Sequence, residues 1–163
     1  MLHHVSVGVR DVERAAKFYD AVLGALGYRR VMEFLPYAVA YGDANPSFWV
    51  QLPHNQQVAS AGNGVHVSFI ARSKGAVDKF HDTAMALGAS NAGEPGPRPD
   101  YGPDYYGAFV FDLDGNKLEA TLLAMPAKKK AMAKPAKKAA KKKAKKAVKK
   151  APAKKAKKKA KRR

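Results

Sequence analysis

One short stretch of this sequence occurs twice in similar form. HVSVGVRD, at residues 4–11, has a counterpart downstream in HVSFIARS, at residues 66–73. The match extends beyond these stretches to further equivalent pairs, namely Lys17 and Lys79, Phe18 and Phe80, and Asp20 and Asp82. An internal repeat of this kind predicts that the chain folds as two copies of one structural module.

Charge divides the chain near residue 125. Residues 1–125 hold ten Lys or Arg and all thirteen Asp or Glu, whereas residues 126–163 hold 21 Lys or Arg and no acid. The net charge of +18 therefore belongs to the C-terminal part alone. We predict a folded domain over residues 1–125, with modules at about 1–55 and 62–124, followed by a Lys/Ala-rich tail that is disordered in isolation.

The chain has no cysteine, which excludes disulfides and thiolate metal sites. It has no apolar N-terminal signal segment and no run of the roughly 18 apolar residues that span a bilayer. We therefore expect a cytoplasmic protein, with the nucleoid as an alternative location because of the basic tail.

The first module is predicted to be a strand, a helix and three further strands. Val5, Val7 and Val9 alternate with polar or small residues, which is typical of a strand with one buried face. Asp11 is a suitable N-cap for a helix that ends at Gly27. Three short strands are predicted downstream, at residues 28–35, 37–42 and 47–53.

The second module repeats this order. Ser73 caps a predicted helix that ends at Gly88, and a Gly/Pro-rich loop at residues 93–104 precedes the strand YYGAFVFD. DLDGNKLE superficially resembles a calcium loop, but it lacks the Gly and Glu that an EF-hand requires at its sixth and twelfth positions, so we predict a hairpin turn. The predicted fold class is α+β, with two β-α-β-β-β modules whose helices cover one face of a concave mixed sheet.

Alternation places four polar side chains on the face that the helices leave open. His4 and His66 occupy equivalent places in the repeated strands, and Gln51 and Glu119 lie on the same face of two other strands. Two imidazoles, a carboxylate and an amide oxygen can bind a divalent Fe, Zn, Mn, Co or Ni ion. We predict an ion held by His4, His66 and Glu119, with Gln51 as a fourth ligand. The alternative is that each histidine caps a strand or forms hydrogen bonds within a polar cavity.

Three aromatic residues are candidates for substrate binding, namely Trp49, Tyr105 and Tyr106. Consecutive strand residues face opposite ways, so one of the two tyrosines is expected to pack against other residues. Ordinary sheet packing is an equally good interpretation of Trp49. Glu119 is the candidate catalytic residue, because a carboxylate beside a Lewis-acidic ion can move a proton. The remaining histidines of interest, His54 and His81, are expected at the surface.

The motifs resemble those of a known superfamily. HVS…DVERAAKFYDAVLGALGY, FWVQ, GVHVSF and YYGAFVFDLDGNKLEA look like the vicinal oxygen chelate superfamily, which contains glyoxalases, bleomycin-resistance proteins and extradiol dioxygenases. The resemblance covers residues 1–124. It implies metal ligands on the first and last strands of each module, which are here His4, Gln51, His66 and Glu119.

The resemblance also implies a function. It predicts a metal-dependent enzyme that acts on a small substrate with vicinal oxygens, by lyase, isomerase or dioxygenase chemistry. The set His, Gln, His, Glu is similar to that of the epimerase branch, whereas glyoxalases usually have Glu where this chain has Gln51. Drug-sequestering members lack the metal, so a metal-free small-molecule binding or drug-resistance protein is the alternative. Small members of the superfamily usually pair, which implies a homodimer.

The tail resembles the C-terminal tails of linker histones and Lys-rich nucleoid proteins. A polycation releases counterions when it meets a phosphate backbone, and without interleaved aromatic residues it does not read sequence. We expect DNA or RNA as its partner and no membrane, because the tail lacks an apolar face. The alternatives are a solubility tail, an acidic protein partner, or a nucleoid-associated protein whose tail carries the function. The residues expected to bind nucleic acid are Lys128, Lys129, Lys130, Lys137, Lys138, Lys141, Lys142, Lys143, Lys145, Lys146, Lys149, Lys150, Lys154, Lys155, Lys157, Lys158, Lys159, Lys161, Arg162 and Arg163.

Overall fold

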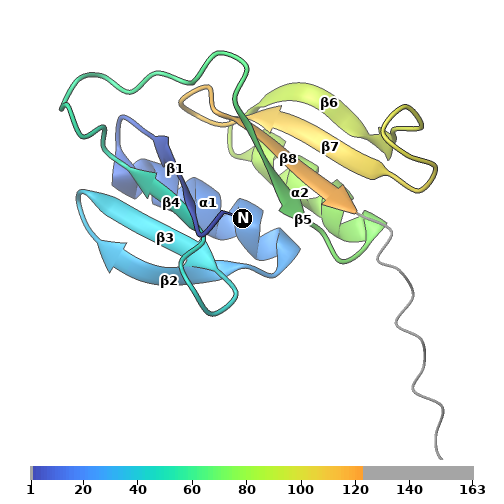
Figure 1. The fold of residues 1–163 in the computed structure, drawn as a ribbon, viewed down its shortest axis with the longest axis horizontal. Helices are drawn as coiled ribbons and strands as arrows, with labels where there is room; N and C mark the ends of the chain where they lie inside the picture. The colour runs from blue at the N-terminus through green and yellow to red at the C-terminus, as the bar shows by residue number, and fades with distance from the viewer. Residues whose placement is uncertain (1, 123–163) are drawn as a thin grey trace, which may run out of the picture. The chain divides into compact units, whose positions relative to one another are not determined.

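The computed structural model describes residues 2–122, which form two four-stranded sheets with one helix each (Figure 1). The first module consists of β1 (Val5–Gly8), α1 (Val12–Leu26), β2 (Arg29–Phe34), β3 (Ala38–Gly42) and β4 (Phe48–Gln51). The second consists of β5 (His66–Ile70), α2 (Lys74–Ala86), β6 (Ser90–Pro97), β7 (Tyr106–Phe111) and β8 (Lys117–Leu122). The α+β class and the duplicated β-α-β-β-β order are confirmed. The predicted tail lies outside the described residues.

Both sheets have the same strand order, β1-β4-β3-β2 and β5-β8-β7-β6. The first strand of each module is an edge strand that pairs in parallel with the last strand. The register places Gly8 opposite Gln51 and Ser68 opposite Glu119. In Figure 1, β1 and β5 lie on the sides of the two sheets that are nearest to each other.

Each helix begins and ends where the sequence signals predict. The side chain of Asp11 accepts a hydrogen bond from the backbone N–H of Arg14, and the side chain of Ser73 accepts one from Ala76. Gly27 and Gly88 end the two helices with φ of 89° and 91°, a conformation that favours glycine. No helix among the described residues is long and apolar enough to cross a membrane.

The helices cover the valine face of the sheets, as predicted. α1 packs on Val9 and Val50, and α2 packs on Leu118 and Ala120, all of which are buried. The two helices also contact each other, so the core is continuous between the modules. Burial of each large apolar side chain contributes about 1.5–3 kcal/mol, which fixes the opposite face of each sheet as the open one.

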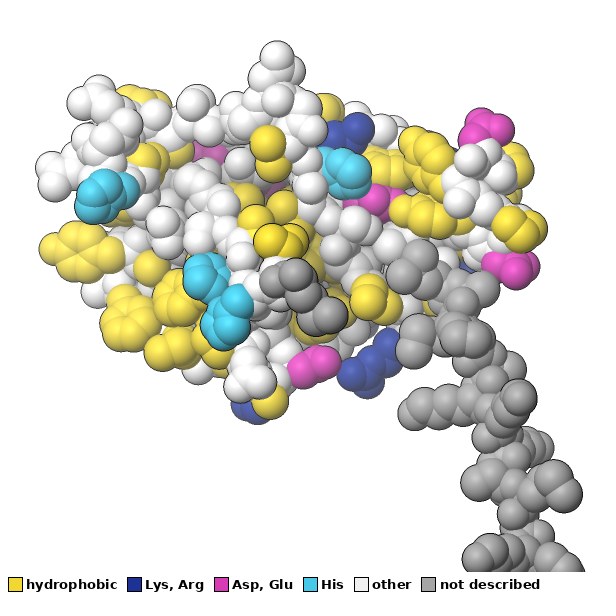
Figure 2. Space-filling model, in the orientation of Figure 1, with side chains coloured by type: hydrophobic (Ala, Val, Ile, Leu, Met, Phe, Trp, Pro, Cys, Tyr) yellow, Lys and Arg dark blue, Asp and Glu magenta, His cyan; other side chains and the backbone are white. Residues whose placement is uncertain are grey.

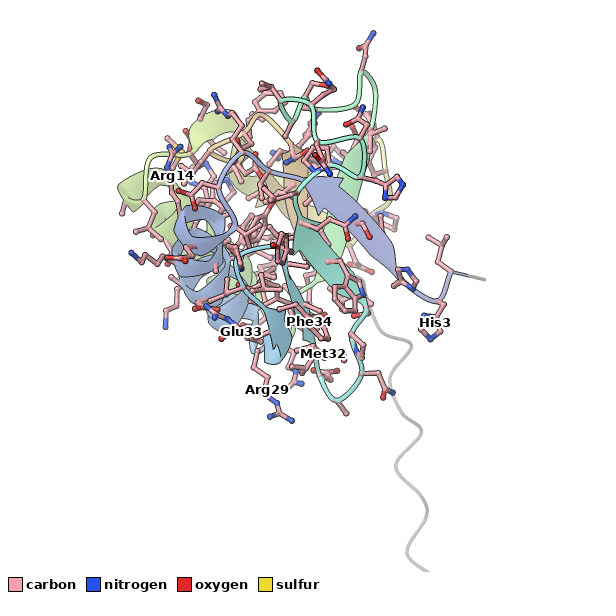
Figure 3. All side chains as sticks on the ribbon, turned by 90° about the vertical axis from the view of Figure 1, so that its left-hand side faces the viewer. His3, Arg14, Arg29, Met32, Glu33 and Phe34 are labelled. Carbon is pink, nitrogen blue, oxygen red and sulfur yellow. The ribbon has the colours of Figure 1, made fainter. Side chains whose placement is uncertain are left out.

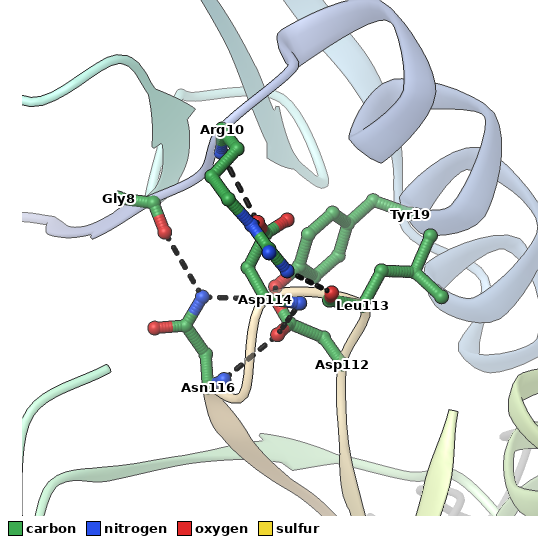
Figure 4. Close-up of polar contacts among 7 residues, drawn as sticks. All are labelled: Gly8, Arg10, Tyr19, Asp112, Leu113, Asp114 and Asn116. Carbon is green, nitrogen blue, oxygen red and sulfur yellow. Dashed lines mark hydrogen bonds and ion pairs between the residues drawn. The ribbon is translucent and has the colours of Figure 1, made fainter. Parts of the chain in front are cut away.

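The turn between β7 and β8 joins the second module to the first (Figure 4). Asp112 Oδ2 accepts hydrogen bonds from the Tyr19 hydroxyl of α1, at 2.5 Å, and from the side-chain amide of Asn116, at 2.9 Å. Asp112 Oδ1 accepts from the backbone N–H groups of Asp114 and Asn116. Burial and the neighbouring Asp112 carboxylate raise the pKa of Tyr19 well above its ordinary value.

Two further contacts complete this junction. Asn116 Nδ2 donates to the carbonyl oxygen of Gly8, at 3.1 Å, and Arg10 Nε donates to Asp114 Oδ1, at 2.6 Å. The predicted hairpin turn is therefore confirmed. Its polar side chains also bind β1, α1 and the segment between them.

One strand lies where a loop was predicted. β6 extends over Ser90–Pro97, although the Gly/Pro-rich stretch from residue 93 was expected to be irregular. Its pairing with β7 shifts register between Asn91 and Gly93 and again between Gly93 and Gly96. β6 is an edge strand, where Gly, Pro and irregular pairing are tolerated.

Candidate functional site

The structure brings two of the predicted metal ligands together, His66 and Glu119. His66 Nε2 lies 3.2 Å from Glu119 Oε2. Glu119 is only 2% exposed, and it lies on the open face of β8 because its neighbours Leu118 and Ala120 face the helix. The pair offers one nitrogen and one oxygen from adjacent parallel strands.

The second oxygen of Glu119 also has a partner. The hydroxyl of Tyr105 donates a hydrogen bond to Oε1. Burial, followed by this hydrogen bond, raises the pKa of Tyr105. Gly107 leaves room for the carboxylate, since a Cβ at this position would lie 3.1 Å from Oε1. Glu119 is therefore held between an imidazole and a phenol.

The same face carries further polar groups. Figure 2 shows a histidine, a basic and an acidic side chain gathered over β5 and β8. The hydroxyl of Thr121, two residues after Glu119 on β8, is buried near the Tyr105 hydroxyl, and this contact opposes the rise in the pKa of Tyr105. Alternation along β8 is the sequence signal that places Thr121 beside Glu119.

The other two predicted ligands lie on the first module. His4 immediately precedes β1, and its Nδ1 lies 2.8 Å from Nδ1 of His3. Gln51 ends β4 and is partly buried. Within residues 2–122, no group of three or more His, Cys, Asp or Glu side chains is close enough to hold a metal ion. One copy of the chain therefore does not join His4 to the pair of His66 and Glu119.

Trp49 lies on the open face of the first sheet. Its ring stacks on that of Phe34 with centroids 6.2 Å apart and an interplanar angle of 16°. Phe34 is 52% exposed, and Figure 3 shows it projecting from β2 beside Met32. The alternation predicted for the strand of Trp49 agrees with this placement, because Phe48 and Val50 are buried on the other face.

The two adjacent tyrosines separate, as alternation requires. Tyr105 contacts Glu119, whereas the hydroxyl of Tyr106 donates to Asp78 Oδ1 of α2, at 2.8 Å. Tyr106 therefore lies on the helix side of the sheet and not beside the candidate site. Of the pair, only Tyr105 is positioned to contact a molecule bound at Glu119.

The surface location predicted for His81 was wrong. His81 is only 4% exposed, and its Nε2 lies 3.2 Å from Asn91 Oδ1 of β6. The helical position alone did not indicate this burial, because it results from the packing of α2 against β6, where Asn91 contacts the imidazole. His54 is exposed, as predicted.

The His66 and Glu119 pair fits two positions of a divalent metal site. Neutral imidazole nitrogen and carboxylate oxygen are common ligands of Zn and of Fe or Mn. The buried hydroxyl of Thr121 lies on the same face. The described residues of one chain thus supply part of such a site.

Two cavities of the described residues lie away from this pair. One of about 900 Å³ is lined by Arg10, Tyr37, Leu52 and the segment that follows β4. Another of about 220 Å³ lies between the modules and is lined in part by Tyr28 and Phe69. His66 and Glu119 line neither of them.

Comparison with known proteins identifies the relatives of this chain. The family model described as Glyoxalase/Bleomycin resistance protein/Dioxygenase superfamily matches residues 1–120. A search of the curated proteins found no match. Among solved structures, a glyoxalase/bleomycin resistance protein from Albidiferax ferrireducens T118 is 37% identical, with a TM-score of 0.68 over 76% of this chain and 98% of that chain.

More distant structures share the fold. Lactoylglutathione lyase from Agrobacterium tumefaciens is 19% identical, with a TM-score of 0.53 over 75% of this chain and 92% of that chain. TioX from Micromonospora sp. ML1 is also 19% identical, with a TM-score of 0.54 over 77% and 98% of the two chains. At these identities the likeness concerns the fold alone, because one fold supports many activities.

Proposed function

Because the chain belongs to the glyoxalase/bleomycin resistance protein/dioxygenase superfamily, we propose that it is a metal-dependent enzyme acting on a small substrate with two vicinal oxygens. The supporting observation is Glu119, a buried carboxylate held by His66 and Tyr105 on the open face of its sheet. Burial of a carboxylate is costly for folding, and such groups are concentrated at sites where a charge is needed for chemistry.

Each residue has a role in this proposal. His66 and Glu119 hold the ion, and His4 and Gln51 are the further ligands. A bound divalent ion supplies Lewis-acid polarisation of the two substrate oxygens. Glu119 Oε2, which faces His66, would be a ligand of the ion, and the Glu119 carboxylate would take a proton from the substrate and return it. The Tyr105 hydroxyl keeps Oε1 in place through its hydrogen bond.

We propose that a second copy of the chain supplies His4 and Gln51. One copy leaves the open face of the first sheet uncovered, with Met32 and Phe34 40% and 52% exposed. A two-fold dimer that placed this face against the Glu119 face of its partner would bury these side chains and complete two equivalent sites. This arrangement agrees with the separation of His4 from the pair of His66 and Glu119 within residues 2–122 of one copy.

The first test is ion binding by the full chain with His66 replaced by Ala. We expect the parent protein to bind one Mn²⁺ per chain in a calorimetric titration. His66→Ala should weaken binding by about 100-fold or more, because even residues behind the direct ligands affect affinity by 10–100-fold. His54→Ala, which removes an exposed histidine, is the control and should leave the affinity unchanged. Equal Mn²⁺ affinity of His66→Ala and the parent would refute the proposal.

A metal-free binding protein is the second candidate. It is favoured by the exposed aromatic surface of Phe34 and Trp49, on which a planar ligand can stack. The same titration separates the two candidates, since this one predicts no Mn²⁺ binding at His66.

We also propose that residues 126–163 attach the protein to DNA or RNA without reading its sequence. The support is the sequence itself, with 21 Lys or Arg and no acid in this stretch. The charge and the lack of aromatic residues fit contacts with the phosphate backbone.

The tail proposal predicts a strong dependence on salt. If about ten lysines engage duplex DNA, the logarithm of the binding constant should fall with that of the salt concentration at a slope near −9. The measurement is an electrophoretic mobility shift at several salt concentrations, with and without residues 126–163. Equal affinity of the two forms would show that the tail is not the nucleic-acid interface.

A further inference from the structure

Three basic side chains surround the ring of Phe109 beside the candidate site. The His66 ring lies 6.3 Å from the Phe109 centroid, Lys117 Nζ lies 5.3 Å from it, and Arg98 Cζ lies 5.6 Å from it. Phe109 is opposite Glu119 in the pairing of β7 with β8, and Lys117 is opposite His66 in that of β5 with β8. The two cations, Lys117 and Arg98, therefore lie on the Phe109 ring beside the Glu119 site.

The guanidinium of Arg98 is held in place by the backbone of β6. Nη2 donates to the carbonyl oxygen of Glu94, at 2.6 Å, and Nη1 donates to that of Pro97, at 3.1 Å. The glycines of β6 make room for this group. A Cβ at Gly96 would lie 3.1 Å from Nη1, and one at Gly93 would lie 3.4 Å from Nη2. Arg98 is thus fixed by its surroundings, which reduces the entropy lost when it binds a ligand.

These cations have no carboxylate partner in the described part of the chain. Neither Arg98 nor Lys117 forms an ion pair there, whereas Arg10 pairs with Asp114 and Arg30 with Asp20. The nearby carboxylate of Glu119 is occupied by His66 and Tyr105. Two cations without an ion-pair partner on one side of the site create a local positive potential that attracts an anion.

We propose that this cluster binds the carboxylate of the substrate, and that the substrate is a small 2-hydroxy or 2-oxo acid. The inference rests on the proposed function and names its substrate class. The planar Arg98 guanidinium matches a carboxylate through paired hydrogen bonds, and Lys117 adds a point charge. The oxygen on the adjacent carbon, which is vicinal to a carboxylate oxygen, then lies toward His66 and Glu119.

The test is a titration of the full chain with L-lactate in the absence of added metal. Binding is monitored through the chemical shifts of the backbone amides. Lactamide, which lacks the charge, is titrated in parallel. Lactate is expected to shift the amides of Gly96, Phe109 and Lys117, and lactamide is not. Arg98→Gln and Lys117→Gln should each weaken lactate binding about ten-fold or more, since each removes a charge-assisted hydrogen bond. Arg72→Gln, which removes an exposed charge elsewhere in the fold, should have no effect.

Several outcomes would overturn the inference. These are lactate shifts confined to residues 126–163, equal responses to lactate and lactamide, or unchanged lactate binding by Arg98→Gln and Lys117→Gln. The result is independent of the metal proposal, because it is measured without metal. If the protein binds Mn²⁺ through His66 but does not bind lactate, this inference is wrong and the proposed metal site stands.

Discussion

Replacement of Asp112 by Ala is expected to lower the free energy of unfolding by about 3–5 kcal/mol, as is typical when one member of a buried charged network is removed. Asp112 is 6% exposed and accepts four hydrogen bonds. The substitution leaves the buried Tyr19 hydroxyl and the Asn116 amide without their shared acceptor. It also releases the turn that holds the second module against the first.

Urea unfolding of the full chain measures this loss. Asp82→Ala is the matched control, because Asp82 is exposed on α2 and forms no ion pair within residues 2–122. It should change stability by no more than about 0.5 kcal/mol. If Asp112→Ala is as mild as Asp82→Ala, the turn does not join the modules as described.

Replacement of Glu119 by Leu should separate function from stability. Leucine fills a similar volume, and on the open face its neighbours include the rings of Phe109, which pairs with residue 119, and Tyr105. Apolar replacement of buried ionic groups is often neutral or stabilising by about 1–4 kcal/mol, so the variant should be at least as stable as the parent. Tyr105, which is only partly buried, can turn its hydroxyl to water. Mn²⁺ binding should nevertheless be lost.

Thermal unfolding and Mn²⁺ titration of the same preparation check both parts. Glu13→Leu is the control, since Glu13 is exposed in the first turn of α1 and should alter neither quantity appreciably. A variant that is strongly destabilised yet still binds Mn²⁺ at the parent affinity would show that Glu119 supports the fold and not the site.

Local patterns predicted most of the fold. Alternation in the first strand identified the buried Val7 and Val9, and the caps at Asp11 and Ser73 identified where the helices begin. These features depend on neighbours within a few residues, which is why they can be predicted from one sequence. The same alternation placed Glu119 on the open face and separated Tyr105 from Tyr106.

Features that depend on long-range packing were harder to predict. The burial of His81 follows from its contact with Asn91 on β6. The sequence signal for this strand is weak because β6 contains Gly and Pro. Arg98 had no local signal, because its position depends on β6 and on the ring of Phe109. The alternation of side chains along a strand placed His4 and His66 on equivalent faces. It does not determine the distance between strands of different modules or different copies.

The most direct test of the metal site is the anomalous scattering of Mn²⁺ in crystals of the full chain. The account predicts a peak about 2.0–2.2 Å from both His66 Nε2 and a carboxylate oxygen of Glu119, with His4 and Gln51 of a second copy completing the coordination. A peak at His3 and His4 alone, or none beside Glu119 at saturating Mn²⁺, would contradict it.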